Sequence, residues 1–391
     1  MATLPDTDWL RREGLADLTA ALGPANMRWV GGAIRDTLLG LAVADVDCAT
    51  MHEPARVMEL CEEAGIRTVP TGIDHGTVTA ILPGGPVEVT TLRRDVATDG
   101  RRATVRFATD WRDDAARRDF TINALYANPE TLEIADYFGG LADLADRRVR
   151  FIGEARERIA EDHLRILRYY RFQARFGAEL DEEAEAACAD MAGTLRGLSR
   201  ERIAAELLAL LKHPDPHATI ARMHDRGVLG VILPEAGTET IAALERLIAH
   251  EQERGVAPHP LRRLAALLPP DPETAESVAA RLRLSKAQRA RLVAAAQRTS
   301  ADGADIRALA YRIGPEAALD RIVLLGGDPA PLDGWAPPAF PLRGGTIVAR
   351  GIAAGPEVAR MLRRVEDRWI GEGFPDADRV AHILDEELKE R

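Results

Sequence analysis

Roughly the first 150 residues alternate between short apolar runs and amphipathic runs, a pattern typical of a mixed α/β domain. Apolar side chains at helical spacing, among them Trp9, Leu10 and Leu15, predict a helix over residues 1–25. Other β-prone and periodic runs predict further strands and helices. The predicted strands are 28–30, 45–49, 77–82, 87–92 and 133–136, and the predicted helices are 33–39 and 54–64, the second with a proline at its start.

Strand signals disappear after about residue 154, and apolar positions then recur at helical spacing to the end of the chain. Proline-rich breaks at 214–216, 269–270 and 329–338 separate these periods. The predicted helices are 156–176, 181–191, 199–211, 217–226, 238–250, 260–268, 274–283, 286–298, 305–313, 355–369 and 376–390. The pattern therefore predicts a small α/β head followed by an all-helical body.

The chain has 391 residues, of which 46% are hydrophobic and 29% charged, so it is long enough for two or three globular domains. No apolar run approaches the roughly 18 residues of a membrane span, and we expect no membrane association. Cys48, Cys61 and Cys188 show neither the CxxC spacing of a zinc site nor a disulfide framework. A reduced, cytoplasmic protein is the simplest interpretation.

The formal net charge of −11 by itself argues against binding to nucleic acid. The positive charge is nevertheless concentrated, because nearly all of it is arginine and it clusters at residues 93–118 and 147–175. Guanidinium groups suit bidentate contacts to phosphates and base edges. A GC-rich genome also raises arginine usage, so the clustering, and not the number, indicates a site for a nucleotide or RNA.

A double glycine, Gly31-Gly32, lies between a predicted strand and a predicted helix. Such a unit exposes backbone N–H groups at a helix N-terminus, and glycine lets a triphosphate approach the backbone. Asp45 and Asp47 follow at positions i and i+2 of the next predicted strand, so their side chains share a face. Paired carboxylates of this kind can hold two Mg²⁺ ions for a displacement at phosphorus.

Taken singly, a GG turn and a DxD pair are ordinary turn features. In this order they fit the pattern GGxxRDxxLGxxxxDxD, and the chain resembles the class II tRNA nucleotidyltransferases (CCA-adding enzymes) and bacterial poly(A) polymerases of the polymerase-β superfamily. The resemblance implies a polymerase-β-like nucleotidyltransferase head in which Asp45 and Asp47 bind Mg²⁺ and Gly32 and Arg35 contact the nucleotide. The matching positions are Gly31, Gly32, Arg35, Asp36, Leu39, Gly40, Asp45 and Asp47.

Residues 117–125 read RRDFTINAL and match the second motif of this family letter for letter. Without the family, the same segment is a capped amphipathic stretch with two surface arginines. The resemblance implies that Arg118 contacts the nucleotide phosphates and that Asp119 approaches the ribose. A contact to a ribose hydroxyl would favour NTPs over dNTPs.

Residues 161–176 are predicted to form one helix, on which Asp162 and Arg165 share a face at i and i+3. Arg168 and Arg171 continue that row. On the pattern alone, a salt-bridged helix facing solvent is the simpler interpretation. The EDxxR sequence, however, resembles the family's templating motif. It implies that Asp162 and Arg165 hydrogen-bond the base edges of CTP or ATP, and that Arg168 and Arg171 hold the triphosphate.

Glu88 lies in a predicted strand that follows the aspartate pair in sequence. Polymerase-β-like sites often gather a third carboxylate from a neighbouring strand, so Glu88 is a candidate catalytic residue. An ordinary edge-strand glutamate is the alternative. The charged stretch 93–114 comes next, and in family members a flexible loop at this place assists the switch from CTP to ATP. The pattern alone predicts a disordered hairpin loop.

The resemblance implies a CCA-adding tRNA nucleotidyltransferase that uses CTP, ATP and Mg²⁺ and releases diphosphate. It implies a catalytic head over residues 1–150, a nucleotide-recognition neck over 151–212, and a tRNA-binding body and tail over 213–391. The nearest alternative is a poly(A) polymerase, or an enzyme that adds only A or only CC. A non-catalytic RNA-binding relative is a further alternative, which the presence of both aspartates disfavours.

Overall fold

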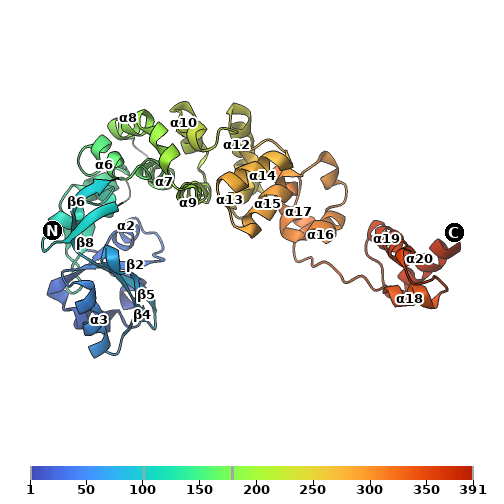
Figure 1. Cartoon of the computed structure of the whole chain (residues 1–391), viewed down its shortest axis with the longest axis horizontal. Helices are drawn as coiled ribbons and strands as arrows, with labels where there is room; N and C mark the ends of the chain where they lie inside the picture. The colour runs from blue at the N-terminus through green and yellow to red at the C-terminus, as the bar shows by residue number, and fades with distance from the viewer. Residues whose placement is uncertain (1, 100–101, 178–179, 390–391) are drawn as a thin grey trace. The chain divides into compact units, whose positions relative to one another are not determined.

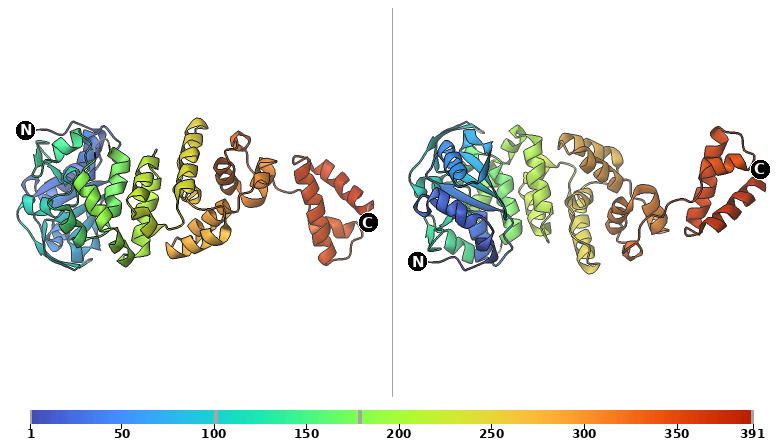
Figure 2. Two further views of the ribbon diagram at one scale, coloured as in Figure 1. Left: turned by 90° about the horizontal axis from the view of Figure 1, so that it is seen from above. Right: turned by 90° about the horizontal axis from the view of Figure 1, so that it is seen from below.

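The computed structural model describes residues 2–99, 102–177 and 180–389. The chain divides into two compact units, Met1–Pro234 and Glu235–Arg391 (Figure 1). All of the described strands lie in the N-terminal unit, and past the last of them the described chain forms only helices and loops (Figure 2). The predicted α/β head with a following all-α region is therefore confirmed.

A seven-stranded mixed sheet is the centre of the N-terminal unit, in the order β3–β4–β5–β2–β1–β8–β9. Strands β2 and β5 are parallel, and the other neighbouring strands are antiparallel. The strands are β1 Met27–Val30, β2 Val46–Thr50, β3 Arg67–Gly72, β4 Thr77–Leu82, β5 Gly85–Thr91, β8 Leu125–Ala127 and β9 Ile134–Asp136. Every predicted strand is present, with small shifts at the ends.

The sequence pattern missed β3 and β8. Strand β3 lies at the edge of the sheet and is mostly exposed, so its apolar side chains do not alternate with polar ones. Strand β8 is only three residues long. The stretch 93–114, predicted to be a disordered hairpin loop, contains an antiparallel hairpin in which β6 Arg93–Asp99 pairs with β7 Arg102–Phe107. The hairpin tip, residues 100–101, lies outside the described residues.

Residues 1–25 do not form the single helix that was predicted. A 3₁₀ turn, Asp8–Arg11, is followed by helix α1, Leu15–Leu22. Gly14 separates the two with a φ of 91°, a left-handed conformation that costs glycine little because it has no Cβ. The apolar spacing was informative nonetheless, since both elements bury apolar side chains against the sheet-containing part of the chain.

Helices α2 and α3 match the predicted helices of the head. An aromatic cluster joins the head to helix α7, Arg165–Phe176. The centre of the Phe120 ring lies 4.9 Å from the centre of the Phe151 ring and 5.4 Å from the centre of the Phe172 ring. The helices of this unit after α1 are α2 Gly32–Leu38, α3 Pro54–Glu63, α4 Trp111–Ala116, α5 Gly140–Ala145, α6 Ala155–Glu161, α7 Arg165–Phe176, α8 Glu182–Asp190, α9 Arg200–Leu211, α10 His217–Asp225 and α11 Val228–Ile232.

The helix predicted over residues 156–176 is interrupted. Asp162 lies between the end of α6 and the start of α7, and its backbone is extended, with φ −148° and ψ 103°. Its carboxylate accepts a hydrogen bond from the Leu164 N–H at 3.1 Å. A short polar side chain that bonds nearby backbone in this way favours a helix end over a helix interior. The argument that Asp162 and Arg165 share a helical face is therefore wrong.

The C-terminal unit is helical throughout its described part. Its last helices pack around Trp369, which is 1% exposed and contacts the rings of Tyr311, Phe340 and Phe374. Helices α17 and α18 were not predicted, and neither were α4, α5 and α11 of the N-terminal unit. The helices of this unit are α12 Thr238–Glu253, α13 Pro260–Ala266, α14 Pro272–Arg281, α15 Lys286–Ala296, α16 Ile306–Ile313, α17 Pro315–Leu324, α18 Gly344–Ala349, α19 Pro356–Gly371 and α20 Ala377–Lys389.

An ionic network is buried in the C-terminal unit. Arg262, on α13, pairs with Glu251 of α12 at 2.7 Å and with Asp320 of α17 at 3.2 Å. All three side chains are at most 1% exposed, so each charge depends on its partners for stabilisation. The network therefore fixes how these three helices pack.

Cys48, Cys61 and Cys188 are free thiols, and all three are buried. Burial raises the pKa of each of these thiols above its ordinary value. Within the described ranges, none of the helices has both the length and the apolar composition to span a bilayer.

Candidate active site

The double glycine forms the turn from β1 into α2. Gly31 has φ 66° and ψ −123°, a combination that glycine adopts without the strain a Cβ would cause. A Cβ at Gly31 would lie 3.4 Å from Nη1 of Arg118, and one at Gly32 would lie 3.6 Å from Nη2 of Arg35. The turn therefore passes directly beside two arginines from the family motifs.

The central carboxylate of the site is Asp47, on β2. Strand register pairs it with Val30, which precedes the glycine turn, and with Glu88 on β5. The structure thus brings Glu88 beside Asp47, as the sequence predicted. Asp45 is exposed and lies one residue before β2, so the strand begins later than was predicted.

The charge at Asp47 is not balanced. Burial and then the neighbouring charge of Glu88 raise the pKa of Asp47 to about 6, with a smaller contribution from Asp45, although Arg118 acts in the opposite direction. A cation bound at these carboxylates would offset this repulsion.

No three His, Cys, Asp or Glu side chains within the described ranges are grouped closely enough to hold a metal ion by themselves. Mg²⁺ does not require such a group, because it keeps several waters and is commonly held by one or two carboxylates together with substrate phosphates. Asp47 and its carboxylate neighbours therefore fit Mg²⁺ that is bound jointly with a triphosphate.

Arg118 is held in place by a buried acid. Its Nε donates to the hydroxyl of Tyr126 at 2.9 Å, and its Nη2 donates to Asp114 at 3.3 Å. The Tyr126 hydroxyl in turn donates to Asp114 at 2.7 Å, and Asp114 is 1% exposed. These bonds orient the guanidinium next to the Gly31 turn. Asp114 and Tyr126 were not predicted, because neither lies within a recognisable motif.

Asp119 is fully engaged by protein groups. One carboxylate oxygen accepts from the Phe120 N–H at 2.9 Å and the Asn123 amide at 3.0 Å, and the other accepts from Arg168 at 2.6 and 2.8 Å. Burial alone would raise its pKa, but Arg168 and these hydrogen bonds lower the pKa of Asp119 to about 2. The residue is thus a fixed anion that links the second motif to α7.

The predicted base-reading residues face different partners. The Asp162 carboxylate accepts from Nη2 of Arg202, on α9, at 2.7 Å. Arg165 donates to Glu161 at 2.6 Å and to the backbone carbonyl of Arg117 at 3.2 Å. Both residues lie at the junction of α6 and α7, but tertiary contacts, and not a shared helical face, place them there.

The two arginines predicted to hold the triphosphate are paired with acids. Arg168 contacts Asp119, as described above, and Glu206 at 3.6 Å. Arg171 contacts Glu206 at 2.8 Å, and its guanidinium lies 4.8 Å from the centre of the Phe172 ring. Glu206 and Arg202 were not among the predicted site residues. Their i, i+4 spacing, which puts both on one face of α9, is the signal that was available.

Arg35 is nearly buried, at 5% exposure. Its guanidinium bonds Asp36 at 2.8 Å and also the Asn123 side chain, and it lies over the rings of Phe172 and Phe176 at 5.2 and 4.9 Å. These contacts make Arg35 a link between α2 and α7. Direct contact between Arg35 and the nucleotide stays a prediction.

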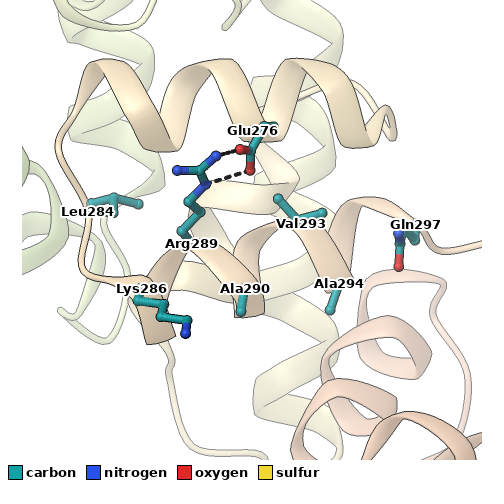
Figure 3. A pocket seen from close by; sticks show the side chains of 8 residues that line it. All are labelled: Glu276, Leu284, Lys286, Arg289, Ala290, Val293, Ala294 and Gln297. Carbon is teal, nitrogen blue, oxygen red and sulfur yellow. Dashed lines mark hydrogen bonds and ion pairs between the residues drawn. The ribbon is translucent and has the colours of Figure 1, made fainter.

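A cavity of about 610 Å³ lies in the C-terminal unit, along α14 and α15 (Figure 3). An ion pair between Arg289 and Glu276 borders it, and Lys286 stands at the start of α15. None of the predicted site residues lines this cavity. Its lining residues are Glu276, Leu284, Lys286, Arg289, Ala290, Val293, Ala294 and Gln297.

Two protein families match the chain. The family described as "Poly A polymerase head domain" covers residues 27–150, and the family described as "Probable RNA and SrmB- binding site of polymerase A" covers residues 177–238. The mouse protein "CCA tRNA nucleotidyltransferase 1, mitochondrial" (Mus musculus) is 36% identical over 392 residues, which span 95% of this chain and 89% of that protein. The chain belongs to the CCA tRNA nucleotidyltransferase family.

Solved structures of CCA-adding enzymes share the fold. The Bacillus stearothermophilus enzyme in complex with CTP matches with a TM-score of 0.74 and 24% identity, over 98% of this chain and 99% of that one. The Thermotoga maritima enzyme complexed with tRNA matches with a TM-score of 0.70 and 21% identity, over the whole of both chains. The CCA tRNA nucleotidyltransferase fold therefore extends through the helical region, beyond the motif-bearing head.

Proposed function

We propose that this protein adds C, C and A in turn to the 3′ end of tRNA, with CTP and ATP as substrates and release of diphosphate. One observation carries the proposal. A chain that is 36% identical to a CCA tRNA nucleotidyltransferase over nearly its full length places Asp47 and Glu88 beside the Gly31 turn and Arg118. That arrangement offers carboxylates for metal, backbone for phosphate and a guanidinium for charge neutralisation.

Asp45 and Asp47 would hold Mg²⁺, with Glu88 as the third carboxylate of the proposed site. Two Mg²⁺ ions bound by these carboxylates would supply charge neutralisation, one by lowering the pKa of the tRNA 3′-hydroxyl and the other by holding the triphosphate. The protein itself contributes positioning, because the reaction needs the 3′-hydroxyl and the α-phosphate in line and requires no covalent intermediate.

Arg118 is proposed to contact the phosphates, since Asp114 and Tyr126 hold it next to the glycine turn. Asp119, fixed by Arg168, is the proposed ribose contact. Asp162 and Arg165 are proposed to read the base. A carboxylate accepts from the exocyclic amino group that cytosine and adenine share, and a guanidinium donates to ring acceptors.

The neck, residues 151–212, is proposed to recognise the nucleotide, and residues 213–391 are proposed to bind tRNA. In support of RNA contact, the RNA-binding family model matches residues 177–238, from the neck into the start of the body, and the structural relative from Thermotoga maritima was solved with tRNA. We further propose that the protein works in a reducing compartment, because its cysteines are free. The cytoplasm remains the prediction from sequence, while the mouse relative is named as mitochondrial.

A poly(A) polymerase is the second candidate, since the head family carries that description. The test uses purified protein, Mg²⁺ and tRNA that lacks its terminal CCA, with labelled CTP or ATP supplied singly and together. CCA addition requires CTP first and ATP afterwards. Extension with ATP alone into tails of variable length would favour the second candidate. D47A serves as the inactive control.

A further inference from the structure

The backbone only partly determines how the Asp162 carboxylate is oriented. Asp162 lies outside both flanking helices and is extended, so no helical hydrogen bonding restrains it. One of its oxygens accepts from the Leu164 N–H, a local contact. The other accepts from Arg202, a residue 40 positions later in the chain. The tertiary contact to Arg202 is therefore what fixes the second oxygen.

The contact between Arg202 and Asp162 is well placed to control the direction in which the Asp162 carboxylate points. Nη2 of Arg202 lies 2.7 Å from Oδ2 of Asp162, and the two side chains are 27% and 30% exposed. A carboxylate offers about four lone-pair positions, and two of these remain after the Leu164 and Arg202 donors have bound. The positions that remain for an amino group of a base thus depend on where Arg202 holds the carboxylate.

We infer that Arg202 is a positioning residue for base selection, which acts by aiming the Asp162 carboxylate at the exocyclic amino group of CTP or ATP. This inference rests on the proposed function, because it takes those nucleotides as substrates. Arg202 belongs to α9, which also carries Glu206, the partner of Arg171. A single face of α9 thus carries a partner of the base-reading carboxylate and a partner of an arginine proposed to hold the triphosphate.

The test compares R202M, which removes the charge and the guanidinium but keeps an unbranched apolar stem, with R202K, which keeps the charge. R200M is the matched control, because it removes an arginine from the same helix. Single-turnover incorporation is measured with each of the four NTPs on tRNA that lacks CCA. R202M lowers the preference for CTP and ATP over UTP and GTP by about fivefold or more, the loss of roughly one hydrogen bond. R202K recovers part of that preference, and R200M leaves it unchanged.

A double variant separates positioning from general structural support. If Arg202 acts through Asp162, R202M has no further effect on base preference in the D162A background. Independent, multiplicative effects of the two changes would overturn the inference. So would an R202M variant that slows all four NTPs by one common factor with its preference intact. Failure of the wild-type protein to add any nucleotide would instead overturn the proposed function.

Discussion

Charged side chains around the proposed nucleotide site are mostly paired with each other, and this pairing decides what each residue can do. Asp119 holds Arg168, Glu206 holds Arg171, and Asp162 holds Arg202 at distances of 2.6 to 2.8 Å. Asp47 is the contrast, since burial and then the charge of Glu88 raise its pKa to about 6, against the opposing effect of Arg118. Pairing limits what each of these side chains can contact, and the unbalanced residue, Asp47, is the proposed ligand for a cation.

The low pKa of Asp119 predicts how stability depends on pH. Its folded-state pKa of about 2 lies below the ordinary value of 3.8, so the ionised form contributes stability that is complete above about pH 4. That contribution is lost as the pH falls through 2. Urea unfolding should show D119N less stable than wild type by about 2 kcal/mol at pH 7, with the difference shrinking between pH 4 and 2. A difference that stays constant over this range would contradict the assignment.

The turn at Gly31 predicts a specific defect. G31A forces a side chain into a positive-φ backbone and places a methyl group in contact with Nη1 of Arg118, so both stability and kcat/KM should fall, kcat/KM by about tenfold or more. Gly65 is the matched control, because its φ of 71° is also positive but a Cβ there meets nothing within 4 Å. G65A should lower the unfolding temperature and leave kcat/KM unchanged. Equal kcat/KM values in G31A and G65A would mean that Gly31 is not part of the active site.

At the scale of elements, helix α9 determines how freely Arg171 can meet a triphosphate. Glu206 lies 2.8 Å from Arg171 and competes with phosphate for it. E206Q should therefore lower KM by about threefold or more for all four NTPs, without a change in base preference. Initial-rate measurements with each NTP check this. A rise in KM would mean that Glu206 positions Arg171 and does not compete for it.

The sequence pattern predicted those helices and strands that are specified by residues close together along the chain. The strands around Asp47 and the glycine turn were found because apolar alternation and glycine spacing are local signals. The break at Asp162 was missed, since the same residues also fit one amphipathic helix. Its contact with Arg202, and that of Asp36 with Arg175, join residues 40 and 139 positions apart, which no periodicity reports.

At the scale of the whole molecule, the net charge of −11 conflicts with an RNA substrate unless arginines make the contact locally. Binding of tRNA should then weaken steeply with salt, with a slope of log K against log salt of about −3 or steeper. Fluorescence anisotropy with labelled tRNA between 50 and 200 mM salt, roughly the range over which such contacts are lost, measures the slope. Affinity that hardly changes with salt would rule out binding through the phosphate backbone.

The central claim is that the protein builds CCA on tRNA without a nucleic-acid template. The most direct measurement incubates tRNA that lacks its 3′ CCA with the full-length protein, Mg²⁺ and all four NTPs, and then sequences the 3′ ends. We predict ends that carry C, C and A in that order and no further nucleotides. Ends that carry runs of A of variable length, or ends that remain unchanged while the tRNA is bound, would contradict the account.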